Sequence, residues 1–115
     1  MNNWNETELT FRCERLSIRL ERLAENFLNM ASLSQDENSA DAVLEVLREN
    51  KMFLELTAID LDVESAFELA QIQRQLSRWH LHWTETWAND GSRLEIATVT
   101  QSWADRVREM SGVLV

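Results

Sequence analysis

The side chains best suited to metal or acid–base chemistry are the chain's two histidines, His80 and His82. Carboxylate-bridged di-iron sites in helical bundles need Glu-x-x-His on two helices, but Ser77 and Trp79 stand three residues before these histidines. Residues two positions apart on a helix point about 200° away from each other, so His80 and His82 do not chelate one ion together. We therefore expect two surface histidines, with no metal and no cofactor.

The single cysteine, Cys13, is the other candidate for chemistry. It shares its predicted helix with no histidine, and only Arg12 beside it would favour a thiolate. Its place between Leu9 and Leu16 on an apolar stripe predicts a buried thiol that packs as a small apolar residue. No Gly-rich phosphate loop and no CxxC pair is present either. Enzymatic function is unsupported, and an enzyme without a recognisable motif is kept only as a third alternative.

Tryptophan is abundant, with five in the chain, and Trp79, Trp83 and Trp87 recur every four residues. On a helix this spacing drifts about 40° per step, which places Trp79 and Trp83 on the core side and Trp87 at its edge. Trp79, Trp83 and Trp103 are candidates to line an apolar ligand pocket. Trp87 suits the rim of the core and an interface equally well, because tryptophan is frequent among interface hot spots.

Heptad spacing predicts a long first helix over residues 6–32. Asn5 followed by Glu8 fits a capping box at its start. The polar residues 34–39 predict the first connection. The stripe that defines this helix consists of Leu9, Cys13, Leu16, Leu20, Leu23, Phe27 and Met30.

Three further apolar stripes predict three more helices. Asp60 and Asp62 can act as N-caps and predict a break near 60–62, although no glycine or proline forces one. Asn89-Asp90-Gly91 predicts the turn before the last helix, and Gly112 suits that helix's C-terminal end. The stripes are Val43, Leu44, Leu47, Leu54, Ala58 and Leu61; then Ala66, Leu69, Ile72, Leu76, Trp79 and Trp83; then Ile96, Val99, Trp103, Val107 and Met110.

Four helices with short connections predict an all-α fold, an antiparallel up-down four-helix bundle with neighbours packed at about 20°. The alternative is three helices, with the second and third continuous in one long central helix. A chain of 115 residues with no proline and two glycines fits a single helical domain over residues 1–115.

The second predicted helix is apolar on more than one side. Exposed, the residues off its main stripe would form an apolar patch on the order of a few hundred Å², which soluble monomers usually avoid. A second copy packed about a two-fold axis would cover this patch; the alternative is that the chain covers the helix by itself. The interface candidates are Met52, Phe53, Leu56, Ile59 and Val63, together with Trp87.

The charge is strongly acidic, with a net value of −9. The acids concentrate in residues 34–70, where Arg48 and Lys51 are the only basic residues. This balance disfavours nucleic acid and anionic membrane surfaces and suits a basic protein partner; the alternative is a solvated, solubilising face. No apolar run approaches about 18 residues, so we expect no membrane span. A lone cysteine and the lack of a signal-peptide pattern predict a cytoplasmic protein.

Taken together, these features predict a non-enzymatic helical protein–protein interaction module, an adaptor or regulator. Its expected partners are itself, as a homodimer, and another protein. A small-molecule-binding helical bundle with an apolar, Trp-lined pocket is the alternative.

Overall fold

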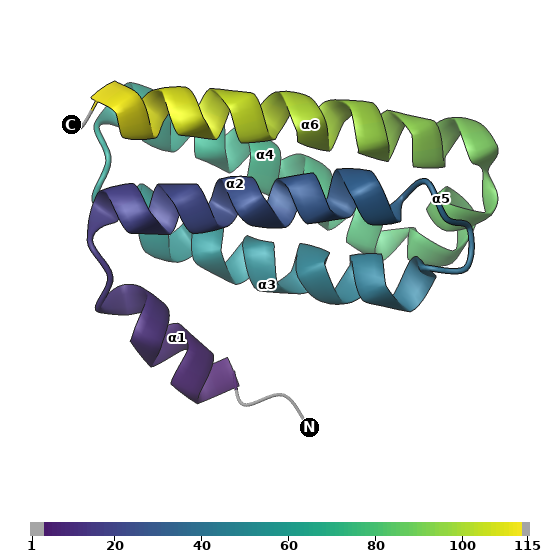
Figure 1. Cartoon of the computed structure of the whole chain (residues 1–115), viewed down its shortest axis with the longest axis horizontal. Coiled ribbons are helices and arrows are strands. Elements are labelled where there is room, and N and C mark those ends of the chain that lie inside the picture. Colours follow the sequence, from purple (N-terminus) through teal and green to yellow (C-terminus); the bar gives the residue numbers. More distant parts are fainter. Residues whose placement is uncertain (1–3, 114–115) are drawn as a thin grey trace.

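The computed structural model describes residues 4–113, and the side chains of residues 5–112. This part of the chain forms six helices, and α2, α3, α4 and α6 make an up-down bundle in which consecutive long helices alternate in direction (Figure 1). The predicted all-α, antiparallel four-helix bundle is confirmed, with two short helices added. None of the described helices combines the length and apolarity needed to cross a bilayer. The helices are α1 (Trp4–Arg12), α2 (Leu16–Leu33), α3 (Ala40–Ala58), α4 (Val63–Leu81), α5 (Trp83–Ala88) and α6 (Asp90–Val113).

The core lies around α2, which packs against both α3 and α6. Most of the predicted stripe residues are buried there, and burial of each Leu or Phe side chain contributes roughly 1.5–3 kcal/mol. Leu44, Ala58, Leu61, Ala66, Val99 and Trp103 are only partly buried. The buried stripe residues are Leu20, Leu23, Phe27, Met30, Val43, Leu47, Leu54, Leu69, Ile72, Leu76, Trp79, Ile96, Val107 and Met110.

The prediction of one long first helix is wrong, because the chain turns between α1 and α2. Arg15 is extended (φ −63°, ψ 154°), and α2 begins only at Leu16. An uninterrupted helix over 6–32 would be longer than each of its bundle partners, since α3 and α4 have 19 residues each and α6 has 24. Leu9 is 60% exposed and Cys13 is exposed, so neither belongs to the core. The structure places Asn5 within α1 and not at a cap.

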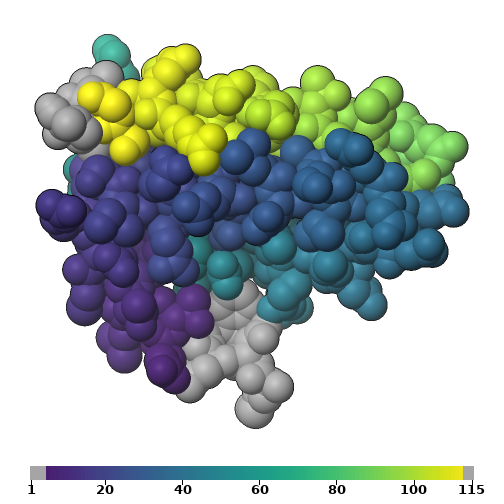
Figure 2. Space-filling view, viewed as in Figure 1, coloured from purple at the N-terminus to yellow at the C-terminus, as the bar shows by residue number. Residues whose placement is uncertain are grey.

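Instead of extending α2, helix α1 folds back against α3 and projects from one end of the bundle (Figures 1 and 2). Phe11, which lies off the heptad stripe, is fully buried there. Its ring stacks on that of Phe53, with centroids 3.8 Å apart and planes 3° apart. The guanidinium of Arg22 lies 5.5 Å from the centre of the Phe53 ring on α3. The chain thus covers part of the second apolar side of α3 by itself, at Phe53.

Arg19, in the first turn of α2, connects the α1–α2 turn to the end of α3. Its buried guanidinium donates to the backbone carbonyl of Glu14 (3.1 Å) and to that of Leu56 (2.6 Å). It also forms an ion pair with Asp60 at 2.8 Å. The carbonyl of Leu56 belongs to the last turn of α3, where carbonyls have no partner within the helix. One side chain therefore joins the α1–α2 connection to the end of α3.

The predicted break near 60–62 is confirmed, so α3 and α4 are separate helices. Asp62 is the N-cap of α4, and its carboxylate accepts a hydrogen bond from the backbone N–H of Ser65 at 3.2 Å. Hydrogen bonding by Ser65 lowers the pKa of Asp62. The cap and the helix N-terminus together set the start of α4 without a glycine or proline.

The C-terminal half departs from the prediction at three points. His82 (φ −112°, ψ 34°) interrupts the expected third helix, so that α5 is separate from α4. Asn89 caps α6 by accepting from the backbone N–H of Ser92 at 2.9 Å, and helix α6 already begins at Asp90. Gly112 lies inside α6, and no glycine has a positive φ in the described chain, so it does not form the expected C-cap.

Candidate functional site

The candidate site is a groove between α4 and α6. The backbones of these two helices lie further apart than those of the other neighbouring helices in the bundle. The space between them is about 420 Å³. Five residues of α4 and four of α6 line it: Phe67, Glu68, Gln71, Ile72 and Gln75, and Glu95, Val99, Trp103 and Arg106.

An apolar surface lies along this groove, formed by Ile72, Val99 and Trp103. The indole of Trp103 packs against Trp79, with ring centroids 5.5 Å apart, and that contact anchors it to the core. Phe67 also lines the groove, yet it is 62% exposed. Exposed aromatic side chains beside an apolar surface are typical of binding sites, because docking of a partner buries both.

Charged residues close one end of the groove. The guanidinium of Arg106 makes two hydrogen bonds to the carboxylate of Glu68 across the groove, at 2.7 and 2.5 Å, and a third to Glu109 at 3.0 Å. Hydrogen bonding from Arg106 lowers the pKa of Glu68, while Asp62 nearby opposes that shift. The same contacts raise the pKa of Arg106, so this cation is permanent. One cation is therefore shared between two carboxylates, close to a third.

The tryptophans predicted to line a ligand pocket do not form one cluster. Trp79 is buried beneath Trp103, and only Trp103 lines the groove. Trp83 packs instead against Trp87, with ring centroids 5.4 Å apart. The helix interruption at His82 lies between Trp79 and Trp83 and ends the continuous stripe that the sequence suggests.

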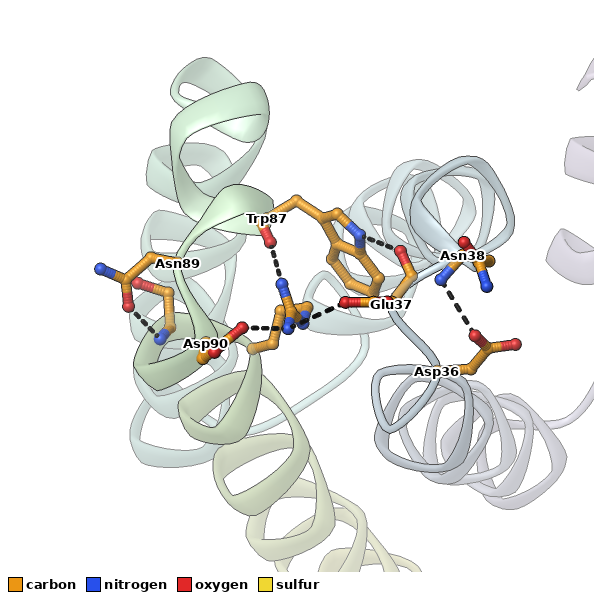
Figure 3. A network of polar contacts seen from close by, with 8 residues as sticks. Asp36, Glu37, Asn38, Trp87, Asn89 and Asp90 are labelled. Carbon is orange, nitrogen blue, oxygen red and sulfur yellow. Dashed lines mark hydrogen bonds and ion pairs between the residues drawn. The ribbon is translucent and has the colours of Figure 1, made fainter.

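Trp87 holds a corner of the bundle and does not lie on an exposed face (Figure 3). Its indole N–H donates to the carbonyl of Glu37 at 2.8 Å. Arg93 lies over the indole ring, donates to the carbonyl of Trp87 at 2.7 Å, and pairs with Asp90 and Glu37. These contacts join the 34–39 connection to α5 and α6. Trp87 is therefore buried in the core of the chain, which favours the core interpretation over an interface.

The predicted apolar patch on α3 is not contiguous. Phe53 is fully buried under Phe11 because α1 folds back, so this candidate is not on the surface of the chain. Met52 and Leu56 are partly buried against the core. Only Ile59 (75% exposed) and Val63 (86%) remain open to solvent, beside the α3–α4 connection.

The histidines and the cysteine lie at separate places on the surface. The Nδ1 atom of His80 is 3.2 Å from the ammonium of Lys51. Burial lowers the pKa of His80, and the charges of Lys51 and Arg48 lower it further. The Nδ1 atom of His82 lies 4.0 Å from Glu85 instead. Across the described residues, no three His, Cys, Asp or Glu side chains gather in a group that could hold a metal ion.

Sequence reasoning missed the rim of the groove, that is Phe67, Glu68, Gln71, Gln75, Glu95 and Arg106. One signal was available: Val63 and Phe67, four residues apart, lie off the stripe of the third predicted helix and imply a second apolar face. The pairing of Arg106 with Glu68 could not be predicted from the sequence, because they are 38 residues apart and only the packing of α4 beside α6 brings them together.

Comparisons with protein-family models, curated proteins and solved structures found no match for this chain.

Proposed function

We propose that this chain is a non-enzymatic protein-interaction module, an adaptor or regulator, that binds a helical segment of another protein in the α4–α6 groove. The observation that carries the proposal is the exposed ring of Phe67 beside the apolar surface of Ile72, Val99 and Trp103. An amphipathic helix laid into such a groove would cover Phe67 and the partly buried Val99 and Trp103, as in other helix-in-groove complexes.

The shape of the groove supports a helix over a small molecule. The groove follows α6 from Glu95 to Arg106, which is about 16 Å at 1.5 Å per residue. Small-molecule sites enclose about 70–90% of the surface of their ligand. This groove is more open, because the side chain of Phe67 that lines it is mostly exposed. A small apolar ligand is the second candidate, favoured by the aromatic contact of Trp103 with Trp79.

Two further parts of the proposal concern location and self-association. A cytoplasmic location is supported by the single, exposed Cys13, which a reducing compartment would keep as a thiol. Of the interface candidates on α3 and at the start of α4, Ile59 and Val63 stay exposed for a homodimer, whereas Phe53 is covered by α1. The acids Asp60 and Asp62 beside them would repel across a two-fold axis.

Site-specific photo-cross-linking in the native cell tests the proposal. A benzophenone amino acid replaces Phe67 in one protein and Leu9, exposed on α1, in the control. We expect a discrete adduct with another protein from position 67, lost when Val99→Ser is added, and none from position 9. Equal adducts from both positions, or none from position 67, would contradict the proposal. An adduct only at twice the chain's own mass would assign the groove to a homodimer.

A further inference from the structure

The charges around the groove indicate the class of helix that it accepts. We infer that the partner is a basic amphipathic helix, with lysine or arginine flanking its apolar side; this inference rests on the proposed function. The helix would place its apolar residues on Ile72, Val99 and Trp103 and its cations at the two ends of the groove.

The end closed by Arg106 carries an excess of negative charge. Arg106 is the one cation among the described residues that line the groove, and both Glu68 and Glu109 bond to it. Asp62 is close enough to Glu68 to influence its pKa. A cationic side chain from a partner would therefore meet at least two negative charges in excess of the positive one, and would not need to displace Arg106.

The other end of the groove holds one acid and one cation, because the guanidinium of Arg78 donates to the amide oxygen of the lining residue Gln75 there at 3.4 Å. Glu95 lines this end and has no ion-pair partner within the described chain. The excess of acid at the Arg106 end, with an apolar surface beside it and Glu95 about three turns along α6, matches an amphipathic helix with basic residues flanking its apolar side. The described length of the groove accommodates about three turns.

The same charges disfavour a second copy of this chain as the occupant. Residues 60–68 hold Asp60, Asp62, Glu64 and Glu68 and no lysine or arginine. The net charge of each copy is −9. Like charges facing each other across an interface weaken binding and slow association. A basic helix would bind this acidic chain more tightly and associate with it faster.

Affinities of matched synthetic peptides test the inference. Three helical peptides share one set of apolar residues at i, i+4, i+7 and i+11 and carry lysine, glutamine or glutamate at the flanking positions. Fluorescence anisotropy measures their binding to the full chain. We expect the lysine peptide to bind at least about tenfold more tightly than the glutamine peptide, about 1.4 kcal/mol, and the glutamate peptide more weakly still. Salt should shrink these differences.

Variants and a scrambled peptide separate the possible outcomes. Glu95→Gln with Glu109→Gln should reduce the preference for lysine, whereas Asp41→Asn, on the first turn of α3, should leave it unchanged. Equal binding of the lysine and glutamine peptides overturns the basic partner but keeps the groove. If no peptide binds, if Phe67→Ser has no effect, or if a scrambled lysine peptide binds as well, both the inference and the proposed function fail. Phe67 is mostly exposed, so this variant is expected to fold.

Discussion

Arg19 joins three segments of the chain through one buried guanidinium. Arg19→Met keeps most of the side-chain volume but leaves the carbonyl of Leu56 without its charged donor. Loss of such a bond costs about 2–3 kcal/mol, and we expect that decrease in the free energy of unfolding by urea titration. The matched control is Arg108→Met, which removes a half-exposed ion pair to Glu21 and should cost less than about 1 kcal/mol. Equal losses would mean that Arg19 acts only as a surface charge.

Leu20 and Leu23 test the packing of α2. Both are fully buried, and replacement of either by alanine should lower the free energy of unfolding by roughly 2–5 kcal/mol through lost burial and a cavity. Leu9→Ala is the control, since this leucine would be their equivalent on an uninterrupted helix but is 60% exposed. A loss from Leu9→Ala as large as the other two would show that α1 continues α2.

His80 gives a pH-dependent prediction. Burial, and then the positive charges of Lys51 and Arg48, hold its pKa below the ordinary value of 6.5. The unfolded chain therefore takes up this proton first as the pH falls through 6.5, so the native state loses stability below that pH. Lys51→Met should raise the pKa of His80 without restoring it fully, because burial is the larger cause. An NMR titration of the His80 ring measures this shift, and an unchanged midpoint in the variant would contradict the contact.

At the scale of elements, α1 is a separable arm on the bundle. Its main contact with α3 is the stack of Phe11 on Phe53. Phe11→Ala should release the arm, and hydrogen exchange should then lose protection over residues 4–12 while α2, α4 and α6 keep theirs. Loss of protection throughout the chain would instead make α1 part of the cooperative core. Leu9→Ala, on the exposed side of the same helix, is the control.

Sequence periodicity was enough to predict the four long helices and most of the core, because each apolar stripe faces the bundle axis. It failed for α1, where Phe11 lies off the stripe and Leu9 lies on it. The position of α3 decides which of these two side chains is buried, and the structure buries Phe11. It also failed at His82, where no breaker residue marks the interruption. The groove could not be predicted from the sequence for a similar reason. Helical spacing says which residues share a face, but the separation of α4 from α6 depends on packing of the whole bundle.

At the scale of the whole molecule, the bundle is asymmetric. Helix α2 packs closely on α3 and α6, whereas α4 stands away from α6 and leaves apolar side chains between them open. On α3, where the sequence predicts an exposed patch, α1 covers Phe53, while Ile59 stays exposed. The α4–α6 groove therefore offers Phe67, Val99 and Trp103 to a partner, and the excess of acid at its Arg106 end favours a basic one.

Amide NMR mapping tests this central claim most directly. The lysine-flanked peptide is titrated into the ¹⁵N-labelled chain. We expect the NMR signals of the Trp103 indole N–H and of the amides of residues 67–75 and 95–106 to shift with a common affinity. The amide signals of α1 and of the adjoining part of α3 should not shift. Two results would contradict the assignment of the α4–α6 groove as the docking face. One is a set of shifts centred on Phe11 and Phe53, and the other is an unchanged Trp103 signal when the chain is saturated with peptide.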